Sequence, residues 1–331
     1  MFQSEHRFAR VRMEATAYTP TFRCSSSSSQ YLSFLILSPN VERGVCCSIP
    51  NRIKLESEGL SSTEKMVLGR GAFGTVVLGE WKGRKVAIKV MQKEEGGMTH
   101  WRRKSLESEL KAKDLEHKNI VHVYDVYAKD NQYAVIIMEY VGSRNLHRLL
   151  IESRDKVLDP GLLLTAAKHV SSALAHCHSK GIIHLDVKPS NVLVNSQGVF
   201  KLGDFGCSVS SSGPSLEVNH SLVGTPGYQA PEFLRGNVPS PACDIYSLAI
   251  LFWQLDARDI PFSGQHPQSV MYLVVAAGLR PCPPSPSISC VNIPAFTSLY
   301  KSCWHKSPSF RPTADDIVES LHIIINVKKN C

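Results

Sequence analysis

Residues 65–91 read KMVLGRGAFGTVVLGEWKGRKVAIKVM, and this segment carries the strongest indication of the fold. Apolar and polar residues alternate along it and glycines interrupt the alternation, a pattern typical of short β-strands joined by tight turns. We therefore predict three strands, with a hairpin turn at WKGRK, residues 81–85. Residues 1–60 include the low-complexity run CSSSSSQ and no lasting helical or strand period, so we predict a disordered leader there.

The chain changes character downstream of these strands. The segment at 100–115, HWRRKSLESELKAKDL, is rich in helix formers and lacks glycine and proline, so it predicts a helix. YAVIIMEYV, residues 133–141, has the composition of a buried strand. From about residue 160 helical patterns dominate, as in the segment that ends on Gly181, a helix-stop signal. A strand-rich first part and a helix-rich second part predict an α+β fold of two lobes with a cleft between them.

Composition excludes several classes of protein. The net charge of +8 comes without an arginine-rich run interleaved with aromatics, so we expect no nucleic-acid binding. None of the ten cysteines forms a C-x-x-C pair, and no secretory signal is evident, which favours reduced thiols and a cytoplasmic location. The apolar run YLSFLIL at 31–37 is too short to span a bilayer, so we expect no membrane association.

Three glycines form a possible phosphate-binding loop. Gly69, Gly71 and Gly74 have the spacing G-x-G-x-x-G-x-V. Dinucleotide-binding folds use a similar spacing, but there a helix follows, whereas TVVLGEW at 75–81 has the pattern of a second strand. A strand–turn–strand flap suits phosphates covered by backbone amides. A plain glycine turn remains the alternative.

Lys89 is a candidate phosphate ligand. It ends VAIK on the third predicted strand, where apolar neighbours make an inward ammonium group costly unless an anion meets it. Polyphosphate oxygens and a carboxylate would meet it together. The predicted helix offers Glu107 and Glu109, which both flank a buried face marked by Leu106 and Leu110, so periodicity does not choose between them. The alternative for Lys89 is an exposed position on an edge strand.

HLDVKPSN, residues 184–191, supplies the candidate chemistry. Asp186 can orient or accept the proton of an attacking hydroxyl, and Lys188 can neutralise charge on a transferring phosphoryl group. Asn191 offers a neutral oxygen ligand for Mg²⁺, and Asp204 in KLGDFG follows 13 residues later. Mg²⁺ keeps several waters and needs only one or two protein ligands beside a nucleotide. Taken singly, each acidic residue has an ordinary alternative as a loop or cap residue.

With these pieces in this order, the chain from about residue 60 to 325 resembles the eukaryotic protein kinase family. The resemblance rests on the glycine-rich loop, VAIK, HLDVKPSN, DFG, APE, DIYSLAI and FRP. It implies a kinase domain at 61–326, with an N-lobe at about 61–141 and a C-lobe at about 142–326. It also implies ATP and Mg²⁺ between the lobes.

The resemblance also implies roles for individual residues. Lys89, Asp186 and Lys188 would be catalytic, with Asp186 as the base, and Asn191 and Asp204 would hold Mg²⁺. Met138 would be the gatekeeper and Glu139 to Val141 the hinge, while Asp244 would support the catalytic loop and Arg311 would pair with Glu232. The implied nucleotide-binding residues are Leu68, Gly69, Arg70, Gly71, Ala72, Phe73, Gly74, Thr75, Val76, Lys89, Glu109, Met138 and Glu139.

The substrate class follows from the same motifs. Lys188, and Thr225 within GTPGYQAPE, resemble serine/threonine rather than tyrosine kinases. CDIYSLAILFWQ, PFSG and YLVVAAGLRP resemble a germ-cell member of the family. That resemblance implies a monomeric MAP kinase kinase kinase that phosphorylates MAP kinase kinase in oocyte maturation and metaphase II arrest. Residues 1–45 carry none of it. The alternatives are a Raf-like or mixed-lineage kinase and a pseudokinase scaffold.

Two residues in the motifs are unusual. Leu185 stands where many kinases carry an arginine that binds a phosphate on the activation loop, and leucine offers no donor. One hypothesis is that the active shape needs no activation-loop phosphorylation; the alternative is that Leu185 only packs while other basic residues bind the phosphate. Cys207, just after DFG, would either line the ATP site or be a small buried residue, and we favour the second.

Overall fold

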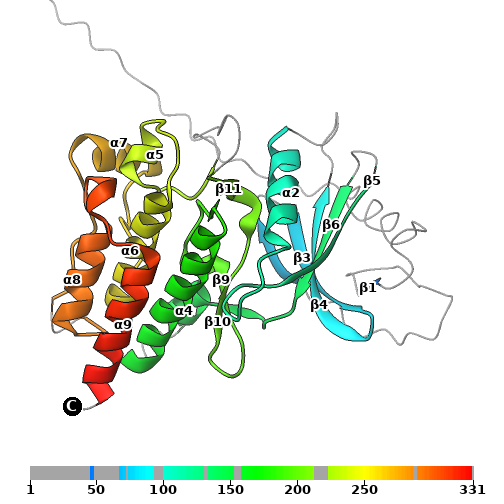
Figure 1. Cartoon of the computed structure of the whole chain (residues 1–331), viewed down its shortest axis with the longest axis horizontal. Coiled ribbons are helices and arrows are strands. Elements are labelled where there is room, and N and C mark those ends of the chain that lie inside the picture. Colours follow the sequence, from blue (N-terminus) through cyan, green and yellow to red (C-terminus); the bar gives the residue numbers. More distant parts are fainter. Residues whose placement is uncertain are drawn as a thin grey trace, which may run out of the picture.

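The computed structural model describes residues 45–47, 67–71, 74–92, 100–129, 133–152, 158–211, 223–285 and 289–329. These residues form two lobes, one built on a β-sheet and one mainly helical (Figure 1). The α+β two-lobed prediction is confirmed. The predicted leader at 1–60 lies outside the described residues except for Val45–Cys47, and the predicted domain boundaries stay predictions.

The N-lobe is an antiparallel sheet in the order β1-β3-β4-β6-β5, with β2 paired to β3. Between β3 and β4, Lys82 and Gly83 both have positive φ, 52° and 73°, which is the conformation of a two-residue hairpin turn. The turn predicted at 81–85 is therefore present. The strands are β1 (Val45–Cys47), β2 (Val67–Gly71), β3 (Gly74–Trp81), β4 (Arg84–Gln92), β5 (Val123–Lys129) and β6 (Tyr133–Glu139).

The two faces of this sheet have separate cores. Val86, Ile88 and Val90 of β4 pack in one buried cluster, whereas Met91 packs with Leu106 of α2 (His100–Ala112) in another. Side chains alternate along a strand, so Lys89 shares the face of Met91 and points toward α2. The alternation of β4 therefore sends the one buried lysine of the strand to the helix side of the sheet.

The C-lobe packs around α6 (Pro241–Ala257), whose residues are buried almost all round, as expected of a helix at the centre of a core. The long helix α4 (Pro160–Ser179) packs against α6 and α9. Asp159 caps α4 by accepting a bond from Gly161 N at 2.9 Å, and Gly181 ends it with φ 68°. The other helices are α3 (Leu146–Glu152), α5 (Pro231–Leu234), α7 (Pro267–Ala276), α8 (Pro294–Cys303) and α9 (Ala314–Lys329).

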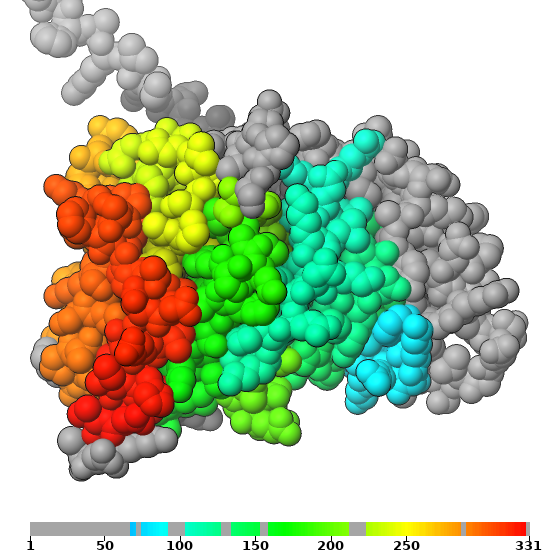
Figure 2. All heavy atoms as spheres, in the orientation of Figure 1, coloured from blue at the N-terminus to red at the C-terminus, as the bar shows by residue number. Residues whose placement is uncertain are grey.

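Short strands and 3₁₀ turns of the C-lobe carry the motif residues toward the sheet. The space-filling view shows the cyan surface of the N-lobe directly against the green surface of the C-lobe (Figure 2). No helix in the described ranges is long and apolar enough to cross a membrane. The short elements are β7 (Arg144–Asn145), β8 (Ile182–Ile183), η1 (Pro189–Asn191), β9 (Val192–Val194), β10 (Phe200–Leu202), η2 (Phe205–Cys207), β11 (Val209–Ser210) and η3 (Pro308–Phe310).

Candidate active site

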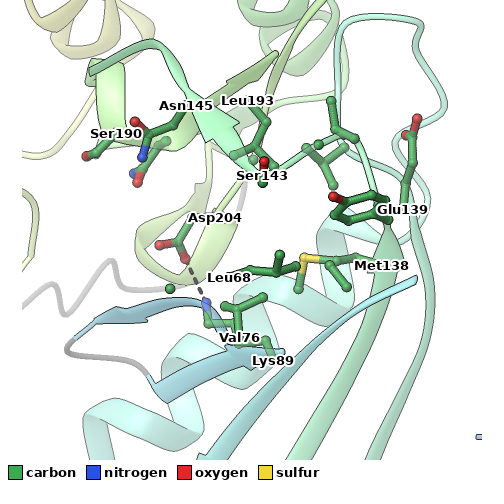
Figure 3. Close-up of a pocket in the computed structure, with 18 of the residues that line it drawn as sticks. Leu68, Val76, Lys89, Met138, Glu139, Ser143, Asn145, Ser190, Leu193 and Asp204 are labelled. Carbon is green, nitrogen blue, oxygen red and sulfur yellow. Dashed lines mark hydrogen bonds and ion pairs between the residues drawn. The ribbon is translucent and has the colours of Figure 1, made fainter. Parts of the chain in front are cut away.

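A cleft of about 380 Å³ lies between the lobes. The volume is within the range of small-molecule sites. Apolar side chains of both lobes face into it, and Lys89 and Asp204 lie together at one end (Figure 3). Its lining is Leu68, Gly69, Arg70, Gly74, Val76, Ala87, Lys89, Glu109, Val121, Met138, Glu139, Tyr140, Val141, Gly142, Ser143, Asn145, Lys188, Ser190, Asn191, Leu193, Gly203 and Asp204.

Lys89 is held between two carboxylates. Its Nζ lies 2.7 Å from Glu109 Oε1 and 2.7 Å from Asp204 Oδ1, and Figure 3 marks the second contact. Burial alone would lower the pKa of Lys89, but Asp204 and Glu109 raise it above its ordinary value. Lys89 therefore stays charged in a buried position. The Asp204 side chain remains 33% exposed in the cleft, which leaves room for a cation or phosphate beside it.

The pKa values of the two carboxylates, Asp204 and Glu109, shift in opposite directions. Burial of Asp204 opposes its ionisation, but the Lys89 ammonium outweighs that effect and holds the pKa of Asp204 below its usual range. Burial raises the pKa of Glu109, and Lys89 only partly counters this rise. Asp204 is thus the carboxylate best kept ionised for a metal ion, whereas Glu109 serves to hold the lysine.

The prediction for the buried face of α2 is partly wrong. Leu106 is buried as expected, but Leu110 is 44% exposed. The face turned toward the C-lobe carries the polar residues Ser105, Ser108 and Glu109, all of them buried. It approaches the η2 segment, where polar partners are available, so hydrophobic periodicity does not mark it. Because Glu109 lies on this face, it is the glutamate that reaches Lys89.

Asp186 lies among donors from its own segment, the catalytic loop at residues 184–191, and from Thr225. Its Oδ1 accepts a bond from Thr225 Oγ1 at 2.7 Å, and its Oδ2 lies 2.7 Å from Lys188 Nζ. Lys188 Nζ also donates to Thr225 Oγ1 at 2.6 Å. Asn191 Nδ2 donates to Asp186 Oδ2 at 3.0 Å and to the Asp186 carbonyl at 2.9 Å. A hydroxyl group is therefore held between a carboxylate and an ammonium.

Asp244 of α6 fixes the backbone that presents Asp186. Its buried carboxylate accepts the N–H groups of His184 and Leu185, each at 2.8 Å, and lies 2.9 Å from His178 Nε2. The His184 ring accepts a bond from Asp186 N at Nδ1, so its Nε2 is the nitrogen that donates to the Gly203 carbonyl at 3.2 Å. The support that the resemblance implied for Asp244 is thus present in the geometry.

Comparison with known proteins accounts for this arrangement. Residues 62–323 match the model of the protein kinase domain. The chain belongs to the protein kinase family. Among curated proteins, it is 39% identical over 262 residues to the serine/threonine-protein kinase mos of Patiria pectinifera, covering 77% of this chain and 73% of that protein.

Two vertebrate relatives carry the same name. Identity to serine/threonine-protein kinase mos of Xenopus laevis is 34% over 267 residues, covering 77% of this chain and 73% of that one. Identity to proto-oncogene serine/threonine-protein kinase mos of Mus musculus is 35% over 265 residues, covering 75% and 76% respectively. The chain is therefore a serine/threonine protein kinase similar to the mos kinases, which confirms that resemblance.

Most residues predicted for the ATP site of this kinase do line the cleft. Thr75 does not, and the structure gives no description that would place Gly71, Ala72 and Phe73 against the cleft. The sequence missed Ala87, Val121, Gly142, Ser143, Asn145, Ser190, Leu193 and Gly203. Two of these are glycines at which a Cβ would meet a neighbour, Gly142 at 2.7 Å from the Val194 carbonyl and Gly203 at 2.9 Å from the Val121 side chain.

The hinge is anchored by a side-chain contact that the sequence did not predict. Glu139 pairs with Lys201 of β10 at 2.7 Å, and its Oε2 accepts a bond from His122 N at 3.3 Å. In Figure 3, Glu139 lies at the end of the cleft opposite Asp204. Its carboxylate is thereby occupied, so Glu139 contributes to the site by joining the lobes at the hinge rather than by presenting its charge to phosphates.

The remaining motif residues of the kinase are structural. Arg311 donates two bonds to Glu232, at 2.6 and 2.8 Å, so the pair implied by the resemblance is present. Cys207 is buried and does not line the cleft, and burial raises the pKa of its thiol to about 12. The favoured interpretation of Cys207 as a small buried residue therefore agrees with its position.

The donor set fits a nucleotide with Mg²⁺. The amide nitrogen of Asn191 donates to Asp186, so its oxygen is the group that could bind a cation. Asn191 and Asp204 both line the cleft. Within the described ranges, no three His, Cys, Asp or Glu side chains cluster as a dedicated metal site. Mg²⁺ suits such a place because phosphates and waters supply most of its ligands.

Proposed function

We propose that this kinase uses ATP with Mg²⁺ to phosphorylate serine or threonine residues of MAP kinase kinase. One observation carries the phosphotransfer part of the proposal. The Thr225 hydroxyl lies between Asp186 and Lys188, so this pair is already arranged to hold the alcohol of a substrate. Similarity to the mos kinases supports the choice of substrate.

The residues of the chain act mainly by positioning and by charge. Lys89, fixed by Glu109, would hold the α- and β-phosphates, and the apolar walls of the cleft would receive the base. The substrate hydroxyl would take the place of Thr225 Oγ1 beside Asp186, and Asp186 would orient it toward the γ-phosphate. Lys188 would neutralise charge on the transferring group. Magnesium, when bound beside Asn191 and Asp204, would neutralise the phosphate oxygens.

The cellular role that we propose follows the resemblance. A mos-like MAP kinase kinase kinase would act in oocyte maturation and in arrest at metaphase II, as a monomer in the cytoplasm. The catalytic groups Lys89, Asp186, Asn191 and Asp204 are all present in one site, which supports an enzyme over a pseudokinase scaffold.

The test is phosphate transfer to MAP kinase kinase. The full-length chain is incubated with Mg-[γ-³²P]ATP and a catalytically inactive MAP kinase kinase, and the labelled residues are mapped by mass spectrometry. We expect label on serine or threonine with the native chain and none with Asp186→Asn. Asp315→Asn, an exposed acid on α9, is the matched control and should behave as the native chain.

The outcomes separate the two parts of the proposal. Label on a general acceptor such as myelin basic protein but none on MAP kinase kinase would refute the proposed substrate and leave the kinase activity standing. No label on either acceptor with the native chain would favour the scaffold.

A further inference from the structure

A buried serine on α2 contacts the segment that follows Asp204. Ser108, adjacent to Glu109, is 7% exposed. Its hydroxyl donates to the Ser208 carbonyl at 2.7 Å, across 100 residues of sequence. This bond joins the helix that carries the lysine's partner to the C-lobe, and neither the motifs nor the proposed mechanism uses it.

Ser208 occupies a junction in the C-lobe. It is buried four residues after Asp204, and its own N–H donates to the Phe205 carbonyl at 2.9 Å. The next residues form β11, which pairs with β8 in the register Val209↔Ile183. Strand β8 runs directly into the catalytic loop. The position of Ser208 is therefore tied to Asp204 on one side and to the approach to Asp186 on the other.

We propose that Ser108 is a positioning residue that holds α2 on the C-lobe and so keeps Glu109 on Lys89. The proposal rests on the kinase activity and assigns Ser108 no contact with ATP or substrate. Leu185 has no side-chain donor with which to bind a phosphate on the activation loop, so a phosphate bound at this position does not help to hold α2. The Ser108–Ser208 bond is instead an internal polar contact, made between uncharged groups.

The bond biases the position of α2 without locking it. Ser108 Oγ also lies 3.0 Å from the Lys104 carbonyl, one turn back in the same helix. A hydroxyl has a single proton, so it can serve only one of these acceptors fully. If α2 moves away, the hydroxyl turns to Lys104, whereas the buried Ser208 carbonyl loses its donor. The loss of this one bond therefore costs about as much as leaving one buried carbonyl without a donor.

The same helix supplies a matched control. Ser105 lies three residues earlier on the same face of α2 and is 2% exposed. Among the described residues its hydroxyl has no hydrogen-bond partner. Ser105→Ala and Ser108→Ala therefore remove the same atom from the same buried face, but only the second removes a bond to the C-lobe.

The experiment compares full-length native chain with S105A, S108A and S108T, all treated with phosphatase beforehand. It measures kcat toward MAP kinase kinase or, if that acceptor fails, myelin basic protein, together with KM for ATP. The stoichiometry of Mg-ADP binding counts the folded sites. We expect S108A to lose about three- to tenfold in kcat per binding site, the effect of one orphaned buried carbonyl. KM for ATP should change less than kcat, because the variant removes no group that lines the cleft.

The two neighbouring variants complete the test. S105A should match the native chain, and S108T, which keeps the hydroxyl, should recover most of the lost rate. An unchanged kcat in S108A, equal losses in S105A and S108A, or no recovery in S108T would each overturn the proposal. If the native chain transfers no phosphate to any acceptor, the proposed function fails, and that result is distinct from all of these.

Discussion

Leu185 combines an unfavourable backbone with two compensating contacts. Its φ of 63° is left-handed, which costs a bulky residue about 1–2 kcal/mol. Its N–H donates to Asp244 at 2.8 Å, and its side chain is buried in the core of the C-lobe. The side chain of Leu185 therefore packs in the core, and its backbone helps to shape the catalytic loop. Neither group is available to bind a phosphate.

Asp244 is the acceptor that holds this backbone in place. Asp244→Ala should leave the N–H groups of His184 and Leu185 without their buried acceptor. We expect the free energy of unfolding to fall by about 3 kcal/mol, because each orphaned buried donor costs about 1–3 kcal/mol. Urea denaturation measures the loss, and kcat should fall with it as the catalytic loop relaxes.

Asp244→Asn is the control, because it keeps the shape and one acceptor oxygen. It should lie between the native chain and the alanine variant in stability. A loss below about 1 kcal/mol in Asp244→Ala would show that the carboxylate does not hold the loop.

The lack of a side-chain donor at Leu185 predicts that the activity does not depend on activation-loop phosphorylation. Phosphatase treatment of the purified kinase should leave kcat unchanged, since no arginine at this position needs a phosphate. Activity before and after treatment, with phosphorylation followed by mass spectrometry, gives the answer. A collapse that reverses only when the serines of CSVSSSGPS, residues 207–215, are phosphorylated again would contradict the prediction.

Among the elements, α2 contacts both lobes through two adjacent buried residues. Glu109 meets Lys89 of β4, and Ser108 meets Ser208 of the C-lobe. Beyond its C-terminal end, the segment leading to β5 is held by stacking of His117 on His176 of α4, with ring centroids 5.2 Å apart. The position of α2 and of the segment after it thus depends on a strand of the N-lobe and on a loop and a helix of the C-lobe.

The His117 contact predicts a pH dependence of stability. Burial lowers the pKa of His117, and His176, Lys118 and Lys201 lower it further. A base whose pKa is lower in the folded state takes up its proton preferentially when unfolded. Stability is therefore complete above the ordinary histidine pKa of about 6.5 and falls as the pH drops below it.

Chemical denaturation at neutral and mildly acidic pH tests this contact. His117→Gln should lower stability at neutral pH but flatten the loss on acidification. An unchanged pH dependence in the variant would assign the effect elsewhere, for example to His147 or His169, whose pKa values burial also lowers.

At the scale of the whole molecule, the site forms only where the two lobes meet. The N-lobe supplies Lys89 and Glu109, and the C-lobe supplies Asp186, Asn191 and Asp204. Neither lobe alone holds both Lys89 and Asp186. The catalytic groups are distant in sequence, so the fold rather than any single motif creates the chemistry.

The sequence predicted the parts of this site that have local signals. The hairpin at Lys82 and Gly83 follows from turn chemistry, and the motif residues follow from fixed spacing. The sequence did not predict contacts such as Ser108 to Ser208, because no local pattern records a pairing across 100 residues. It also misjudged Leu110, since the face of α2 that turns inward is polar and the hydrophobic period does not follow it.

The most direct test of the central claim, that both lobes converge on one phosphoryl-transfer site, is the rate of Asp186→Asn. The measurement is steady-state transfer from Mg-ATP to a protein acceptor, with Mg-ADP binding followed in parallel. We predict a fall in kcat of at least about 100-fold, the usual contribution of a positioned base, with nucleotide binding retained. Transfer at the native rate by Asp186→Asn, with binding intact, would contradict the account.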